Sequence, residues 1–201
     1  MVMHKRVVGS ILAIMGVVAT MHAASAAIID STVPFVTSTG STHTDIVDGA
    51  NVSFFDAYQS STVTMSGGEV SFLTLHDAAS ADISGGAIGF LQVYDNSFAT
   101  LTGVDTLSWL IVDTNAFVEI HAANVLFSSG ILSGNWGDGT AFEFWAVNGS
   151  SGQPISIPES LPSNISIVPL RVPEPATLSL LALGLAGVVF GRSRRKLAQG
   201  G

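Results

Sequence analysis

Three aspartates in the middle of the chain recur at a fixed spacing. Asp77, Asp95 and Asp113 stand at positions that differ by 18 at each step. A fixed period brings equivalent residues to the same place in successive structural units, and carboxylates stacked about 4.8 Å apart repel one another. Either solvent and backbone N–H groups at an exposed turn, or a bridging divalent cation such as Ca²⁺, can relieve that repulsion. The three residues are therefore candidate calcium ligands, and both explanations stay open.

No catalytic motif accompanies these aspartates. The sequence contains no Gly-x-Ser-x-Gly elbow, no His-Glu-x-x-His motif and no Gly-rich phosphate loop. His76 directly precedes Asp77, but adjacent residues of a strand point to opposite faces, which argues against a catalytic pair. We therefore assign no catalytic residue. A glycan-cleaving enzyme remains an alternative, because stacked carboxylates could flank a glycosidic bond at about 5 to 9.5 Å.

The aspartates belong to a longer repeat. The tetrapeptide Met-Ser-Gly-Gly at 65–68 corresponds to Ile-Ser-Gly-Gly at 83–86 and to Leu-Thr-Gly-Val at 101–104. Apolar and polar residues alternate on both sides of each aspartate, which is typical of strands. A period of roughly 20 residues made of short strands and turns indicates a solenoid. We predict an all-β fold over residues 27–148, a β-solenoid (β-helix) with coils of about 18 residues.

The ends of this repeat region have a different composition. Residues 136–147 predict an aromatic hairpin, with Phe142, Phe144 and Trp145, that would cap an open end of the solenoid. Residues 149–171 are rich in Pro and Ser and are predicted to be an extended linker. An antiparallel β-sandwich is the alternative fold, but a sandwich does not require near-identical repeating units.

Charge is strongly segregated along the chain. The formal net charge is -8, and residues 27–170 hold fourteen of the fifteen acidic residues and none of the seven Lys and Arg. Nucleic acid is excluded as a partner, because Lys and Arg supply most of the affinity for phosphates. Cations and neutral glycans remain candidate ligands. The chain has no cysteine, so no disulfide stabilises it.

Residues 1–26 have the pattern of a signal peptide. Lys5 and Arg6 precede an apolar run over residues 7–21, and Ala24-Ser25-Ala26 supplies the small-residue cleavage pattern. The run is shorter than the roughly 20 residues that span a bilayer. We predict that signal peptidase cleaves after Ala26 and leaves Ala27 as the first residue of an exported protein.

Residues 172–196 combine three elements in a fixed order. Pro173, Glu174 and Pro175 form a segment that the prolines keep extended, as a protease subsite requires. Residues 176–191 predict a short transmembrane helix, which is followed by a basic cluster at 192–196. The positive charges would hold that end in the cytoplasm and place residues 27–172 outside. The basic cluster consists of Arg192, Arg194, Arg195 and Lys196.

This order of elements resembles the PEP-CTERM sorting signal. The resemblance implies that exosortase, a membrane protease, recognises Pro173, Glu174 and Pro175 after transient insertion of the helix into the inner membrane. It also implies a location at the cell surface or outside the cell. The family is associated with exopolysaccharide and the biofilm matrix of Gram-negative bacteria.

These observations favour an exported, non-enzymatic surface or extracellular-matrix protein. Extracellular polysaccharide is its candidate partner, and no cofactor is predicted apart from the Ca²⁺ considered above. The first alternative is a calcium-dependent or glycan-binding adhesin module. Phe54, Phe55, Tyr58 and Tyr94, if exposed, could stack on sugars, but aromatic residues at alternating positions more often belong to a core, so we assign no site to them. The second alternative is the glycan-cleaving enzyme of solenoid fold.

Overall fold

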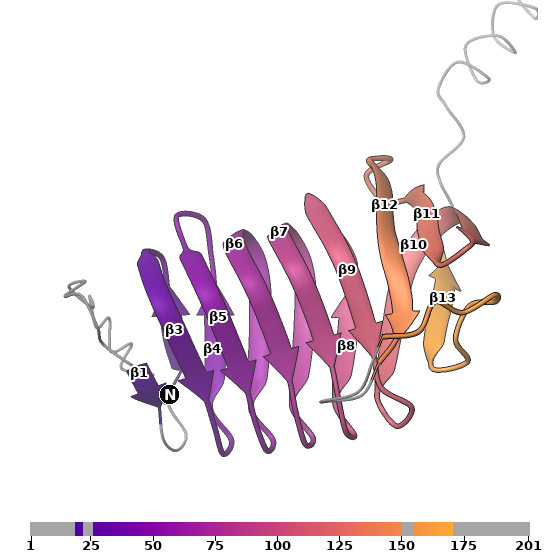
Figure 1. Ribbon diagram of the computed structural model, residues 1–201. Helices are drawn as coiled ribbons and strands as arrows, with labels where there is room; N and C mark the ends of the chain where they lie inside the picture. Colours follow the sequence, from indigo (N-terminus) through magenta and orange to yellow (C-terminus); the bar gives the residue numbers. More distant parts are fainter. Residues whose placement is uncertain (1–18, 22–25, 150–154, 171–201) are drawn as a thin grey trace, which may run out of the picture. The chain divides into compact units, whose positions relative to one another are not determined.

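The computed structural model describes residues 19–21, 26–149 and 155–170. These residues form strands joined by turns and short irregular segments, and the strands wind into a β-solenoid of about five turns (Figure 1). The predicted all-β solenoid is confirmed. Among the described residues, no helix is long and apolar enough to cross a membrane. The predicted transmembrane helix at 176–191 lies outside them.

The coils contribute strands to two parallel ladders, which form the two layers seen in Figure 1. The first ladder contains β1 (Ala19–Met21), β3 (Thr32–Ser38), β5 (Asn51–Ala57), the second halves of β6 (Thr62–Leu75) and β7 (Ser80–Val93), and β9 (Thr106–Val112). The second contains β2 (Ala26–Ile29), β4 (His43–Ile46), the first halves of β6 and β7, β8 (Phe98–Leu101) and the start of β10 (Phe117–Ser128).

The register between coils takes two values. Val36 pairs with Phe55, Phe55 with Leu73, Leu73 with Leu91 and Leu91 with Leu110, so the position numbers advance by 19, 18, 18 and 19. Within the last step the extra residue enters at a corner, because Ile83 pairs with Leu101 but Ala87 pairs with Thr106. The predicted period of 18 is therefore correct for the central coils and too short by one at either side.

Stacked apolar side chains fill the interior. Phe55, Leu73, Leu91 and Leu110 form one column, and each is completely buried. A second column, facing it from the other ladder, contains Ile46, Met65, Ile83, Leu101 and Ile120. Complete burial of such a side chain contributes about 1.5 to 3 kcal/mol, and identical positions in successive coils repeat that gain. The apolar residues of the alternating sequence pattern are thus the ones that form the core.

Each coil turns at two corners. One is a four-residue turn closed by a backbone hydrogen bond, for example from Ala79 N to His76 O at 3.0 Å. The other follows the Ser-Gly-Gly segment, where Gly68 and Gly86 adopt positive φ angles of 76° and 84°. A Cβ on Gly86 would lie 2.7 Å from the carbonyl oxygen of Gly67 in the preceding coil. The repeated glycines are therefore required by both conformation and space.

The predicted aromatic hairpin is present and closes the solenoid. The end of β10 pairs antiparallel with β11 (Ile131–Asn135), which pairs antiparallel with β12 (Ala141–Asn148). The last four residues of β12 then join the first ladder beside β9. β12 thus occupies the place of the next coil's strand on that face, and an unpaired strand edge is covered.

The segment predicted as a linker at 149–171 is partly incorporated into the body. Its later part forms β13 (Ile165–Pro169), which pairs parallel with β10, and Asn148 forms a bridge with Ser156. Asn164 Nδ2 donates to the carbonyl oxygens of Asp113 and Ala116, and Ile165 is buried. The linker prediction was wrong for these residues, because the other edge of β10 offers backbone partners that composition does not reveal.

Substitution of Gly86 tests the close packing of the coils. Gly139 also has a positive φ, 91°, but a Cβ there would meet no atom within 4 Å. Gly139→Ala should therefore cost about 1 to 2 kcal/mol from backbone strain alone, whereas Gly86→Ala should cost about 1 to 3 kcal/mol more because coils must move apart. Urea unfolding of the two variants measures both. Equal losses would show that coil contact at Gly86 is unimportant.

Candidate functional site

Asp77 and Asp95 lie at the first corner, each as the second residue of its turn. Both have a φ of 57°, and Gln59 in the preceding coil has a φ of 60°. Aspartate tolerates this left-handed conformation better than most residues because its short side chain can bond nearby backbone. The three residues form one column at an exposed corner of the solenoid.

The carboxylates of this column bind backbone from the coil before. Gln59 N donates to Asp77 Oδ2 at 2.9 Å, and Asp77 N donates to Asp95 Oδ2 at 3.1 Å. One oxygen of each carboxylate is therefore directed to an N–H group of the previous turn. Of the two explanations given above, this geometry matches the turn role.

Asp113 does not join the column. From β7 to β9 the register advances by 19 positions, so Asp113 lies level with Tyr94 and Thr114 takes the place of the next aspartate. Its Oδ1 accepts from Thr114 N at 2.6 Å. Within 26–149 and 155–170, no three His, Asp or Glu side chains are close enough together to hold a metal ion. The proposed role of these aspartates as calcium ligands stays a prediction.

A stack of rings lies beside the aspartate column. His76 is stacked on Tyr58 with ring centroids 4.6 Å apart, and Tyr94 follows at 5.6 Å. His76 Nδ1 lies 3.7 Å from Asp95 Oδ2, so its acidic neighbour is in the next coil and not Asp77. Burial raises the pKa of both tyrosines, and the negative charge of Asp113 adds to the effect at Tyr94.

A longer aromatic row follows the outer side of the first ladder. Phe54 and Phe72 stack at 5.0 Å, Phe72 and Phe90 at 4.8 Å, and the row continues at 6.3 Å to Trp109. Trp109 then stacks on Trp145 at 5.4 Å. Of the aromatic residues predicted to be exposed, Phe54 is 46% exposed, but Phe55 is completely buried because it points into the core.

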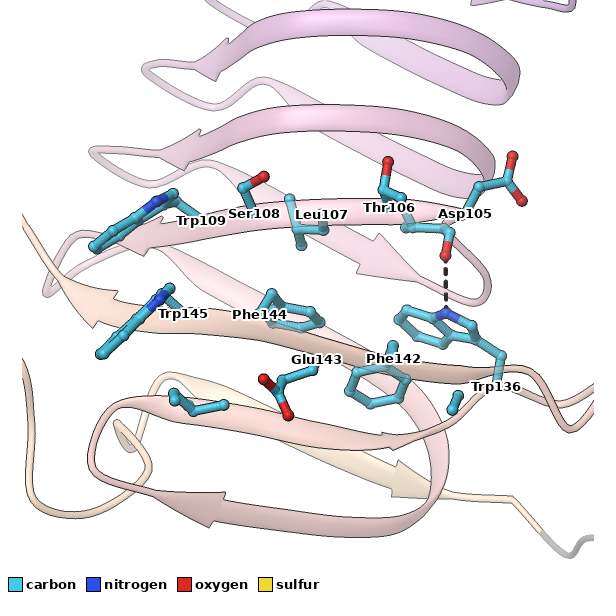
Figure 2. Close-up of a pocket in the computed structure, with 13 residues that line it drawn as sticks. Asp105, Thr106, Leu107, Ser108, Trp109, Trp136, Phe142, Glu143, Phe144 and Trp145 are labelled. Carbon is cyan, nitrogen blue, oxygen red and sulfur yellow. Dashed lines mark hydrogen bonds between the residues drawn. The ribbon is translucent and has the colours of Figure 1, made fainter.

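A pocket opens where this row reaches the cap. β12 pairs with β9 only from Trp109 and Trp145 onward, and the preceding parts of the two strands are not paired with each other. The space between them forms an open pocket of about 540 Å³ (Figure 2). Its aromatic lining consists of Trp109, Trp136, Phe142, Phe144 and Trp145. These are all three tryptophans of the chain and two of its eleven phenylalanines.

Trp136 holds one end of the pocket. Its indole Nε1 donates to Val104 O at 3.0 Å, as Figure 2 shows, and its side chain is only 3% exposed. This bond satisfies the carbonyl group of Val104, which lies two residues before β9 begins at Thr106. The ring of Trp136 also contacts Phe142, with centroids 4.2 Å apart. The aromatic wall is therefore fixed by packing and by a buried hydrogen bond.

Polar groups surround the aromatic wall. Thr106, Ser108 and Glu143 line the pocket and are exposed, as is Asp105, whose Oδ2 accepts from Gly86 N at 3.2 Å. Among the described residues, no hydrogen bond engages the indole N–H of Trp109 or Trp145 or the carboxylate of Glu143. The pocket thus combines apolar surface with both donors and acceptors, the usual composition of a ligand site.

Sequence reasoning did not identify this pocket. Trp136 and Trp145 belonged to the predicted hairpin at 136–147, but Trp109 lies in the repeat and nothing in the sequence linked it to them. The available signal was the equivalence of Phe54, Phe72 and Phe90, evenly spaced in the sequence, which the longer last step carries on to Trp109. Pairing of Trp109 with Trp145 depends on how the cap folds back, and no repeat encodes it.

Comparison with known proteins identifies a sorting signal at the C-terminal end of the chain. The family model for the PEP-CTERM protein-sorting motif matches residues 171–196. The chain carries a PEP-CTERM sorting motif. This motif implies processing by exosortase, with export and sorting to the cell envelope. No curated protein and no solved structure matches the chain.

The predicted sorting residues fall within that match but outside the described residues. They are Pro173, Glu174, Pro175, Arg192, Arg194, Arg195 and Lys196. At the other end, Ala24 also lies outside, whereas Ala26 and Ala27 are the first residues of β2. Cleavage after Ala26 stays a prediction. It would remove β1, which pairs with β3 in the uncleaved chain.

Two variants of Asp77 distinguish the turn role from calcium binding. Asp77→Asn keeps an acceptor oxygen and tolerates the positive φ, so its stability should change by less than about 0.5 kcal/mol. Asp77→Ala loses both and should cost about 1 to 3 kcal/mol. Thermal unfolding with calcium and with a chelator gives the comparison. A calcium-dependent rise in midpoint that Asp77→Asn abolishes would contradict the turn role.

The two tyrosines predict a shift in alkaline titration. Tyr58 and Tyr94 are the only tyrosines of the chain, and the fold raises the pKa of each above 10.0. The folded state therefore favours the neutral phenols. Their contribution to stability is fully present below the ordinary tyrosine pKa of 10.0 and is lost as the pH rises through the raised pKa values. Tyrosinate absorbance should appear at higher pH in the native chain than in denaturant. Coincident curves would contradict burial of the phenols.

Proposed function

We propose that this protein is a non-enzymatic component of the cell surface or extracellular matrix, associated with exopolysaccharide in a Gram-negative biofilm. The observation that carries the proposal is the attachment of a PEP-CTERM sorting motif to a β-solenoid body. The sorting motif accounts for export and sorting, and the solenoid body is the part of the chain that would act outside the cell. Signal peptidase would release residues 1–26, and exosortase would act at Pro173, Glu174 and Pro175.

The solenoid suits a matrix role because backbone pairing and core packing, without disulfide crosslinks, hold its coils together. Its backbone is paired from coil to coil, and its core columns contain large side chains with no exposure to solvent. The first layer presents a row of aromatic side chains, Phe54, Phe72 and Phe90, over successive coils. A repeated surface of this kind can contact an extended polymer at several points, and weak contacts then add up.

The carboxylates support a structural role over a hydrolytic one. Asp77 and Asp95 each accept a backbone N–H of the preceding turn, which orients their side chains along the solenoid and not toward a bound substrate. A glycan-binding module is the second candidate, and the aromatic pocket between β9 and β12 favours it. The two functions are compatible, since a matrix protein must hold the polymer around it.

Measurement of the intact mass of the protein tests the predicted route of export and processing. The protein recovered from the surface and medium should lack residues 1–26 and everything beyond the Pro-Glu-Pro region at 173–175. Two matched samples should retain the tail: cells without exosortase, and a variant with Pro173, Glu174 and Pro175 changed to alanine.

Fractionation of the same samples tests the matrix role. Processed protein should sediment with the exopolysaccharide fraction, whereas the unprocessed variant should stay with membranes. A tail of full length in native cells would overturn the sorting step. Processed protein found only free in the medium would overturn the matrix association.

A further inference from the structure

We propose that the pocket between β9 and β12 binds a neutral polysaccharide chain. The proposal deepens the proposed function, because it names the site and the chemical class through which the body would hold the matrix. The pocket is formed by Asp105 just before β9, by Thr106 and Ser108 in the part of β9 that does not pair with β12, and by the facing residues of β12. Trp136 lies at its end (Figure 2). It belongs to the junction of solenoid and cap, away from the sorting motif in the sequence.

The size and lining fit a short sugar segment. A volume of about 540 Å³ lies within the range of small-molecule sites, roughly 300 to 1,000 Å³. The C–H groups of a pyranose ring present apolar surface, and aromatic side chains are the protein groups that cover such surface best. Five aromatic residues line the pocket, and Trp136 is held in place by its bond to Val104 O. The wall is therefore formed before any ligand binds.

The polar groups match the hydroxyls of a sugar. Thr106 and Ser108 can donate and accept, the carboxylate of Glu143 can accept, and the indole N–H groups of Trp109 and Trp145 can donate. None of these five side chains has a hydrogen bond within the described part of the chain. A purely apolar ligand would leave them unused, whereas a polyhydroxylated one would engage donors and acceptors together.

Charge selects a neutral glycan over an anionic one. Residues 27–170 contain no Lys or Arg, and the pocket itself carries the carboxylates of Asp105 and Glu143. A uronate or sulfate group would meet negative charge there, with no Lys or Arg of this stretch to relieve the repulsion. The ligand class is thus a neutral glycan.

The aromatic row extends the site beyond one sugar. Phe90, Phe72 and Phe54 lead away from Trp109 along the outer face, one ring per coil. Coils are spaced about 4.8 Å apart, which is comparable to the length of one hexose unit along a glycan chain. A chain seated in the pocket could therefore continue along the row. The strongest contacts remain in the pocket, where polar groups accompany the rings.

Tryptophan fluorescence reports on this site directly, since all three tryptophans line it. The full chain, held in a zwitterionic detergent without a sugar headgroup, is titrated with neutral hexasaccharides of glucose and of mannose. An oligouronate of equal length is the anionic comparison. We expect a saturable fluorescence change with at least one neutral hexasaccharide and none with the oligouronate.

Two pocket variants and one control locate the binding. Trp145→Ala should weaken binding by about tenfold or more, and Glu143→Ala, at an exposed position, by about threefold or more. Phe117→Ala removes a ring from the other layer, where Phe117 stacks on Phe98, and should leave affinity unchanged. Circular dichroism and thermal unfolding confirm that each variant is folded.

Three results would overturn this proposal. They are the absence of any fluorescence change with neutral hexasaccharides, tighter binding of the oligouronate, and equal affinity in Glu143→Ala and the wild type. If any of these occurs while processed protein is still found in the matrix fraction, the pocket is ruled out as the glycan-binding site and the proposed function stands. If the full chain binds neutral sugars but its tail is not processed in cells, the proposed function is overturned and the role of the pocket in glycan binding stands.

Discussion

The parallel backbone ladder between coils is the interaction on which the rest of this structure depends. It holds each residue against its equivalent 18 or 19 positions away, so side chains meet others of the same kind. Inside, that arrangement stacks Phe55, Leu73 and Leu91 into a continuous core. Outside, it stacks like charges and like rings. The outer rows are tolerable because Asp77 and Asp95 bind backbone N–H groups and the rings pack face to face.

The same ladder creates a requirement at its end. A parallel sheet can always accept another strand, so the last coil must present something other than an open edge. Here β10 continues into an antiparallel cap. β12 pairs with β9 at the end of the first ladder, and β13 pairs with β10 at the end of the second. The change from parallel to antiparallel pairing leaves a gap. That gap, between the parts of β9 and β12 that do not pair with each other, is the aromatic pocket.

Route and activity are encoded in different parts of the chain. Export and sorting depend on a short motif at 171–196, which an enzyme reads as local sequence. Any binding activity depends on the body, where the relevant side chains are brought together by the fold. The body's negative charge and lack of Lys and Arg favour cations and neutral molecules as ligands, and the pocket's aromatic lining is the basis for proposing a neutral glycan.

The sequence by itself determined the sorting motif, the all-β repeat and the inward-facing residues, because each is a local pattern or a short period. It also predicted the hairpin near Trp136 from its aromatic and glycine content. Only the tertiary structure decided that Asp113 leaves the aspartate column, that Ile165 belongs to the body, and that the three tryptophans line one pocket. These features depend on register and on strand pairing between distant segments. One extra residue at a corner shifts every later position, and its effect is fixed by packing against the neighbouring coil.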